Sequence, residues 1–63
     1  MSQAIELKSY IKGYRRFRMT HDKNPNKHIE FYMSIEEHET CGMSGFNLFE
    51  AMCAKYRAEL YLT

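Results

Sequence analysis

Polar and apolar side chains alternate strictly over nine residues, from His28 to Glu36, with Ile29, Phe31, Met33 and Ile35 at the apolar positions. A period of two with aromatic and β-branched residues on the apolar side predicts a β-strand that buries one face. A lone strand leaves its backbone N–H and C=O groups without partners, so we expect a neighbouring strand.

The neighbour that we expect is the segment just upstream, because residues 21–27 read HDKNPNK and form a strong turn signature. Polar and apolar residues also alternate over 16–20. If both strands share an apolar face, Phe17 lies opposite either Phe31 or, in a register shifted by two, Met33. The first register also sets an arginine opposite a glutamate, which is a favourable cross-strand pair.

Residues 4–13 fit two interpretations. As a strand, they continue the odd-numbered apolar alternation through Ile5, Leu7 and Ile11. As a helix capped by Ser2, they form one apolar face from Ala4, Leu7, Tyr10, Ile11 and Tyr14. We favour a strand that continues into the hairpin and bends at Gly13, since glycine inside a strand often marks a bulge or kink.

The last third of the chain is predicted to be a helix. Apolar residues recur there at spacings of three and four, at Phe46, Phe49, Cys53, Tyr56 and Leu60. Asn47 is the expected N-cap, with Ser44 as the rival, and residues 37–45 are predicted to form a loop.

The predicted fold class is α+β, in a single small domain over 1–63. It consists of a curved antiparallel β-hairpin, extended by residues 4–12 if these form a strand, with one C-terminal α-helix packed on the apolar face. Phe31 is expected to be buried between the hairpin and the helix, against Phe49 or Cys53.

The length of the chain restricts the function classes. With 63 residues, a domain has a small core and little room for the scaffold of an enzyme, so we expect a non-enzymatic protein without a cofactor. The apolar share of 44% and the charged share of 27% are typical of globular proteins and argue against disorder. The sequence shows no run of 18 apolar residues and no secretory signal pattern, so we expect a cytoplasmic protein that does not enter a membrane.

Charge is distributed unevenly along the chain. Residues 1–28 carry seven Lys or Arg against two acidic residues, a net charge of +5. Residues 29–63 carry two Lys or Arg against six Glu, a net charge of −4, and the two values sum to the +1 of the whole chain. Such asymmetry is compatible with a nucleic-acid footprint, a steered protein interface, self-association of unlike halves, or pairing of the halves within the fold.

Metal binding and thiol chemistry have weak support in the sequence. Only His38 and Cys41 lie at a spacing typical of zinc ligands, and no second pair follows them. The same two residues form an incomplete nucleophile and base. Without a disulfide framework both cysteines are expected to be reduced, with Cys53 in the core and Cys41 more exposed. We therefore predict no metal site and no catalytic residue.

The richest candidate surface is the outward face of the hairpin. Tyr and Arg, which are enriched in interface hot spots, occupy it at Tyr14, Arg16, Arg18 and Tyr32. We predict a partner-binding site there and a function as a small inhibitor or adaptor of a larger protein. The alternative is a nucleic-acid-binding module, which a pI near 7.8 disfavours. Unpaired strand edges and a small core also suggest a homodimer.

Overall fold

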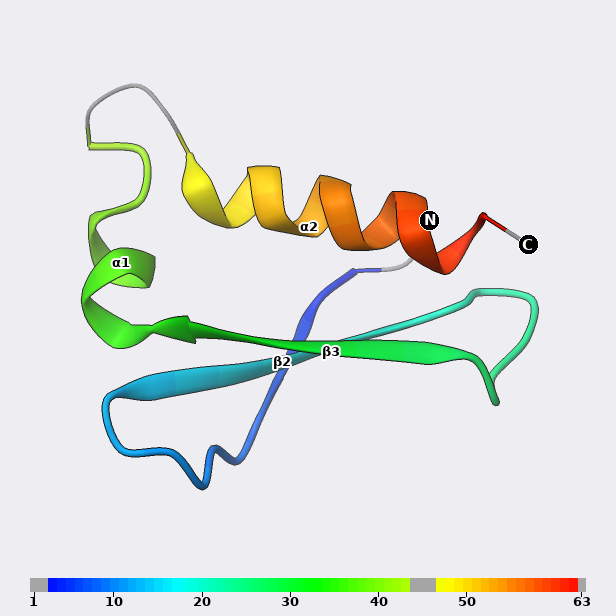
Figure 1. The fold of residues 1–63 in the computed structure, drawn as a ribbon, viewed down its shortest axis with the longest axis horizontal. Helices are drawn as coiled ribbons and strands as arrows, with labels where there is room; N and C mark the ends of the chain where they lie inside the picture. The colour runs from blue at the N-terminus through cyan, green and yellow to red at the C-terminus, as the bar shows by residue number, and fades with distance from the viewer. Residues whose placement is uncertain (1–2, 44–46, 63) are drawn as a thin grey trace.

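A three-stranded antiparallel sheet and two helices make up the structure, a computed structural model that describes residues 3–43 and 47–62 (Figure 1). The strands lie side by side in the order β1-β2-β3. The elements are β1 (Ile5–Leu7), β2 (Tyr14–Thr20), β3 (His28–Ser34), α1 (Ile35–Thr40) and α2 (Leu48–Leu60). The predicted α+β class, with a hairpin and a C-terminal helix, is confirmed.

The hairpin of β2 and β3 has an unbroken one-to-one register. It runs from Tyr14 opposite Ser34 to Thr20 opposite His28. Phe17 lies opposite Phe31, so the first of the two predicted registers is confirmed and the shifted one is wrong. Since side chains alternate across a strand, the odd-numbered residues of β2 and β3 share one face of the sheet and the even-numbered residues share the other.

Of the segment 4–12 that we expected to extend the hairpin, only Ile5–Leu7 form a strand, and this strand faces the opposite way from our expectation. β1 pairs antiparallel with β2, with Ile5 opposite Arg18, so the helical alternative is wrong. The chain does not continue through Gly13 as one bent strand. It reverses there, because Gly13 adopts a φ of +84° and the N–H of Tyr14 donates to the carbonyl of Ile11 at 3.2 Å. The reversal sets Ile5 on the same face as Arg18, where its side chain is 63% exposed.

A short helix replaces part of the predicted loop over 37–45. The side-chain oxygen of Ser34 accepts a hydrogen bond from the backbone N–H of Glu37 at 3.1 Å, so Ser34 acts as the N-cap of α1. The strand therefore ends at Ser34 and not at Glu36, as the alternation had suggested. The predictions made for Ser44 and Phe46 fall outside the described residues.

The helix α2 begins as predicted and covers the odd-numbered face of the sheet. The side-chain oxygen of Asn47 accepts from the N–H of Glu50 at 3.0 Å, which confirms Asn47 as the cap. Phe31 is only 4% exposed, and its ring stacks on that of Tyr56 with centroids 4.8 Å apart. The buried hydrophobic residues among those described are Phe17, Met19, Phe31, Met33, Cys53 and Leu60.

The molecule therefore has two layers and one uncovered sheet face. Figure 1 shows α2 running along one side of the sheet, while the opposite side is approached only by the loop between β1 and β2. Neither helix in the described part of the chain has the length and apolar character needed to cross a membrane.

Candidate partner-binding face

The uncovered side of the sheet, which we call the open face, gathers side chains from all three strands. β-Strand alternation and the register define its members as Ile5, Leu7, Tyr14, Arg16, Arg18, Thr20, His28, Glu30, Tyr32 and Ser34. All four residues predicted from the sequence, Tyr14, Arg16, Arg18 and Tyr32, lie on this face. Tyr14 and Tyr32 remain 45% and 38% exposed.

The centre of the open face is an ion cluster of three side chains. Arg16 Nε donates to Glu30 Oε1 at 2.8 Å, and Arg18 Nε donates to Glu30 Oε2 at 2.9 Å. The terminal nitrogen Nη2 of Arg18 lies 2.5 Å from the same Oε2, so two nitrogen atoms of Arg18 donate to that oxygen. One carboxylate thus holds two guanidinium groups from the neighbouring strand in fixed positions.

Charge within this cluster is permanent near neutral pH. The hydrogen bonds from Arg16 and Arg18 lower the pKa of Glu30 from 4.5 to about 2. The hydrogen bond with Glu30 in turn raises the pKa of Arg16, to which Tyr32 and Tyr10 also contribute. Two positive groups around one negative group leave the cluster with a net charge of +1.

The loop between β1 and β2 forms one border of the open face. Nη1 of Arg16 lies 3.4 Å from the backbone carbonyl oxygen of Lys8, which is within weak hydrogen-bonding range. The ring of Tyr10 is 76% exposed, with the ammonium group of Lys8 5.6 Å from its centroid. The border therefore adds an aromatic ring and a positive charge to the cluster.

Sequence reasoning missed two apolar members of this face and the full role of its carboxylate. Ile5 and Leu7 were assigned to the covered face, because the alternation was carried through Gly13 without a change of facing. Glu30 was expected to pair with one arginine, but it bridges two. The facing of Ile5 and Leu7 depends on the register of β1 with β2. The contact of Glu30 with a second arginine depends on side-chain conformation, and local sequence patterns indicate neither.

Acidic groups gather on the helices, and two of them, Glu36 and Glu39 of α1, line a pocket with Tyr14 and Ser34 at the end of the open face. The two helices carry most of the carboxylates, at Glu36, Glu37, Glu39, Glu50 and Glu59. Arg15, at an odd-numbered position of β2, donates to Glu39 at 3.1 Å and so partly neutralises these carboxylates. The negative charge is that of α1, which has three Glu and no Lys or Arg, whereas α2 has two Glu, one Lys and one Arg and is neutral overall.

The pair His38 and Cys41 is engaged in structural contacts. Nδ1 of His38 lies 2.5 Å from Nη1 of Arg15, and its ring packs on Phe17 and Phe49 with centroids 5.1 and 4.8 Å away. The thiol of Cys41 donates to the carbonyl oxygen of His38 at 3.0 Å. Over residues 3–43 and 47–62, no three His, Cys, Asp or Glu side chains form a group that could hold a metal ion.

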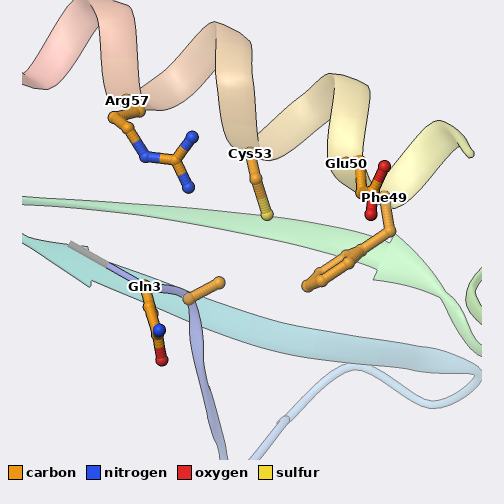
Figure 2. Close-up of a pocket in the computed structure, with 6 residues that line it drawn as sticks. Gln3, Phe49, Glu50, Cys53 and Arg57 are labelled. Carbon is orange, nitrogen blue, oxygen red and sulfur yellow. The ribbon is translucent and has the colours of Figure 1, made fainter. Parts of the chain in front are cut away.

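A cavity of about 530 Å³ opens between α2 and the residues Gln3 and Ala4, which precede β1. Figure 2 shows Phe49, Cys53 and Arg57 pointing from α2 toward the sheet, with Gln3 on the opposite wall. Burial raises the pKa of the Cys53 thiol above its ordinary value of 9.0, so this sulfur stays protonated near neutral pH. A neutral thiol is a poor nucleophile and a poor metal ligand.

No protein-family model, no curated protein and no solved structure matches this chain. The geometry and charge of the open face are therefore the features that bear on function.

Proposed function

We propose that the protein is a small, non-enzymatic protein-binding module that recognises a larger partner through the open face and acts as an inhibitor or adaptor of that partner. The observation that carries the proposal is a sheet face left uncovered by any described element, with two tyrosines and two arginines held around one carboxylate. Tyr and Arg are the side chains most enriched at the energetic centres of protein interfaces.

The fixed positions of the two arginines favour a binding role for the open face over a role as a solvated surface alone. An arginine that is free in solution loses rotamer entropy when a partner fixes it. Arg16 and Arg18 are already fixed by Glu30, with donor–acceptor distances of 2.8 and 2.9 Å for their Nε atoms. The apolar side chain of Ile5, 63% exposed in the same face, adds area that a partner can bury.

The chemistry of the face favours an acidic partner surface. The ion cluster carries a net charge of +1, and Lys8 stands at its border. Complementary charge of this kind orients the partner during encounter and raises the association rate.

Single-stranded nucleic acid is the second candidate, because exposed tyrosines can stack on bases and arginines can contact phosphates. Tyr14 and Tyr32 provide the rings. Against it, Glu30 lies between the two arginines and repels phosphates. The low pKa of Glu30 keeps this carboxylate ionised near neutral pH. We therefore favour a protein partner.

The proposal includes a cytoplasmic location and self-association. Cys41 and Cys53 are both free thiols, as is usual in a reducing compartment. A second copy of the chain is a further partner, which the uncovered edge of the sheet would accommodate.

Affinity capture with matched variants tests the proposal. The bait is the purified chain, the source is its native lysate, and each capture is repeated after nuclease treatment. Arg16→Ala and Tyr32→Ala should each weaken recovery of a stoichiometric partner by about 1 to 3 kcal/mol in binding free energy. Lys55→Ala, a loss of charge on the exposed side of α2, is the control and should recover the partner like wild type.

Two results would contradict the proposal. Recovery that disappears after nuclease treatment would favour the nucleic-acid candidate, and its affinity should then fall steeply with salt. Equal recovery by wild type, Arg16→Ala and Tyr32→Ala would show that the open face is a solvated surface. Circular dichroism of each variant verifies that the fold is unchanged.

A further inference from the structure

The two edges of the sheet differ in length and protection. β1, at one edge, has three residues, whereas β3, at the other edge, has seven. A short edge strand is a common protection against unwanted pairing, as are proline, lysine and bulges. The sequence of β3, HIEFYMS, contains neither proline nor lysine, its one carboxylate, Glu30, is paired with Arg16 and Arg18, and its register with β2 has no bulge. The edge of β3 thus has few of the protections that prevent pairing with a further strand.

The hydrogen bonds at the ends of the hairpin reveal which backbone groups of β3 face outward. The N–H of His21 donates to the carbonyl of Lys27 at 2.9 Å, and the N–H of Ile35 donates to the carbonyl of Gly13 at 3.0 Å. Odd-numbered residues from 27 to 35 therefore direct their backbone groups toward β2, because these groups alternate in an antiparallel ladder. The N–H and C=O groups of His28, Glu30 and Tyr32 and the N–H of Ser34 point to the free edge, whereas the C=O of Ser34, the N-cap of α1, belongs to the first turn of that helix.

We propose that β3 pairs antiparallel with β3 of a second copy of this chain, so that two sheets join into one six-stranded sheet. The dimer would present two open faces side by side. Only this consequence rests on the proposed function, and the association of the two copies does not. No strand within residues 3–43 and 47–62 occupies this edge.

The sequence of β3 selects one register for this pairing. Outward-facing groups must oppose each other, so even-numbered residues pair with even-numbered residues. A two-fold axis at Phe31 pairs His28 with Ser34 and Glu30 with Tyr32, and engages the strand over its whole length. An axis at Glu30 would set two carboxylates opposite each other and leave the end of the strand unpaired. An axis at Tyr32 would leave His28 unpaired.

The chosen register also matches side chains across the open face. Within one copy, Leu7, Arg16 and Tyr32 lie in a row from β1 to β3. The second copy continues this row with its Glu30, Arg18 and Ile5 in the reverse strand order. Each tyrosine then stands between an arginine of its own copy and a glutamate of the other, which is a favourable alternation of cross-strand neighbours.

Sedimentation equilibrium of the purified chain tests the association. We expect a mass of 15.2 kDa, twice the 7.6 kDa of the chain, in the upper part of a range of about 10 to 200 µM, with dissociation on dilution. A mass of 7.6 kDa at every concentration would overturn the proposal.

Backbone N-methylation by chemical synthesis tests the location. Methylation of the Tyr32 nitrogen removes an outward N–H and retains every side chain of the open face, so association should weaken at least about 30-fold, because the dimer loses this bond twice. Methylation of Glu6, whose backbone groups face the free edge of β1, is the control and should associate like wild type. Equal association of both methylated chains, or loss only with Glu6, would overturn the proposal. Circular dichroism verifies that both chains fold.

The register is tested by intermolecular contacts in a dimer with one isotope-labelled copy. In our register, the Hα atoms of Ile29 and Met33 of the two copies approach each other in a non-hydrogen-bonded pair, so a strong nuclear Overhauser effect is expected between them. A contact from Phe31 to Ile29 or Met33 would overturn it. None of these measurements involves the larger partner, so the dimer can fail while recognition of that partner through the open face stands, and the reverse.

Discussion

The two faces of the sheet are built from the same three strands, yet they are held together in different ways. On the covered face, Phe17 and Phe31 stack at 5.4 Å and are shielded by α2, with 3% and 4% exposure. On the open face, the residues next to them in sequence, Arg16, Arg18 and Glu30, remain partly exposed and are joined by ion pairs. Adjacent positions along one strand thus belong to two different chemical environments.

This difference separates stability from function. Hydrophobic burial on the covered face supplies most of the folding free energy, because it removes apolar area from water. Partly exposed ion pairs contribute little to stability, but they fix the positions of charged groups. Substitutions on the covered face should therefore unfold the protein, whereas those on the open face should change recognition.

The largest expected effect is that of Phe31→Ala. Its ring is buried against Phe17, Phe49 and Tyr56, so the truncation leaves a cavity and should destabilise the fold by about 3 to 5 kcal/mol. Small domains have little more stability than this, so the variant should be largely unfolded at room temperature in circular dichroism.

The control for this change is the neighbouring residue on the opposite face. Tyr32→Ala removes a side chain of similar size that is 38% exposed, and should lower stability by at most about 1 kcal/mol. A cooperative melt for Phe31→Ala at the wild-type temperature, or unfolding of Tyr32→Ala, would contradict the assignment of the two faces.

The sequence was sufficient to predict the covered face, since its signals are local. The alternation over β3 predicted the strand and the facing of Phe31, and the spacing of apolar residues with Asn47 predicted α2. The facing of β1 was not predictable by alternation, because β1 ends at Leu7 and the chain reverses over residues 8–13. The length and shape of this connection set the facing of β1 relative to β2.

Two further features needed more than periodicity. The short helix α1 was missed because Ile35 continues the alternation of β3. The capping pattern of Ser34 with Glu37 three residues later was the signal that could have revealed it. The four candidate residues of the open face were predictable by their even-numbered positions. The bridging of Arg16 and Arg18 by Glu30 depends on rotamers, which no spacing rule specifies.

A smaller loss of stability is expected when the N-cap of α2 is removed. Asn47→Ala removes the side-chain oxygen that accepts from the N–H of Glu50, and should lower stability by about 1 kcal/mol. The loss should appear as a lower midpoint in urea with an unchanged slope. Asn47→Asp, which retains a capping oxygen, should remain close to wild type, and equal losses for both variants would exclude a capping role.

The last variant, Glu30→Gln, tests the ion cluster through the pH dependence of stability. The pKa of Glu30 is about 2 in the folded protein and 4.5 without its partners. A carboxyl group whose pKa is lowered on folding stabilises the native state above its unfolded pKa, and this stabilisation disappears as pH falls through the folded pKa. The melting temperatures of wild type and Glu30→Gln should therefore differ at pH 6 and converge between about pH 4.5 and 2. A nuclear magnetic resonance titration of the Glu30 side-chain carboxyl carbon should have its midpoint near 2. A titration midpoint near 4.5 would show that Arg16 and Arg18 do not form ion pairs with the Glu30 carboxylate in solution. The open face would then lack the preorganised arginines on which its proposed role in recognition depends.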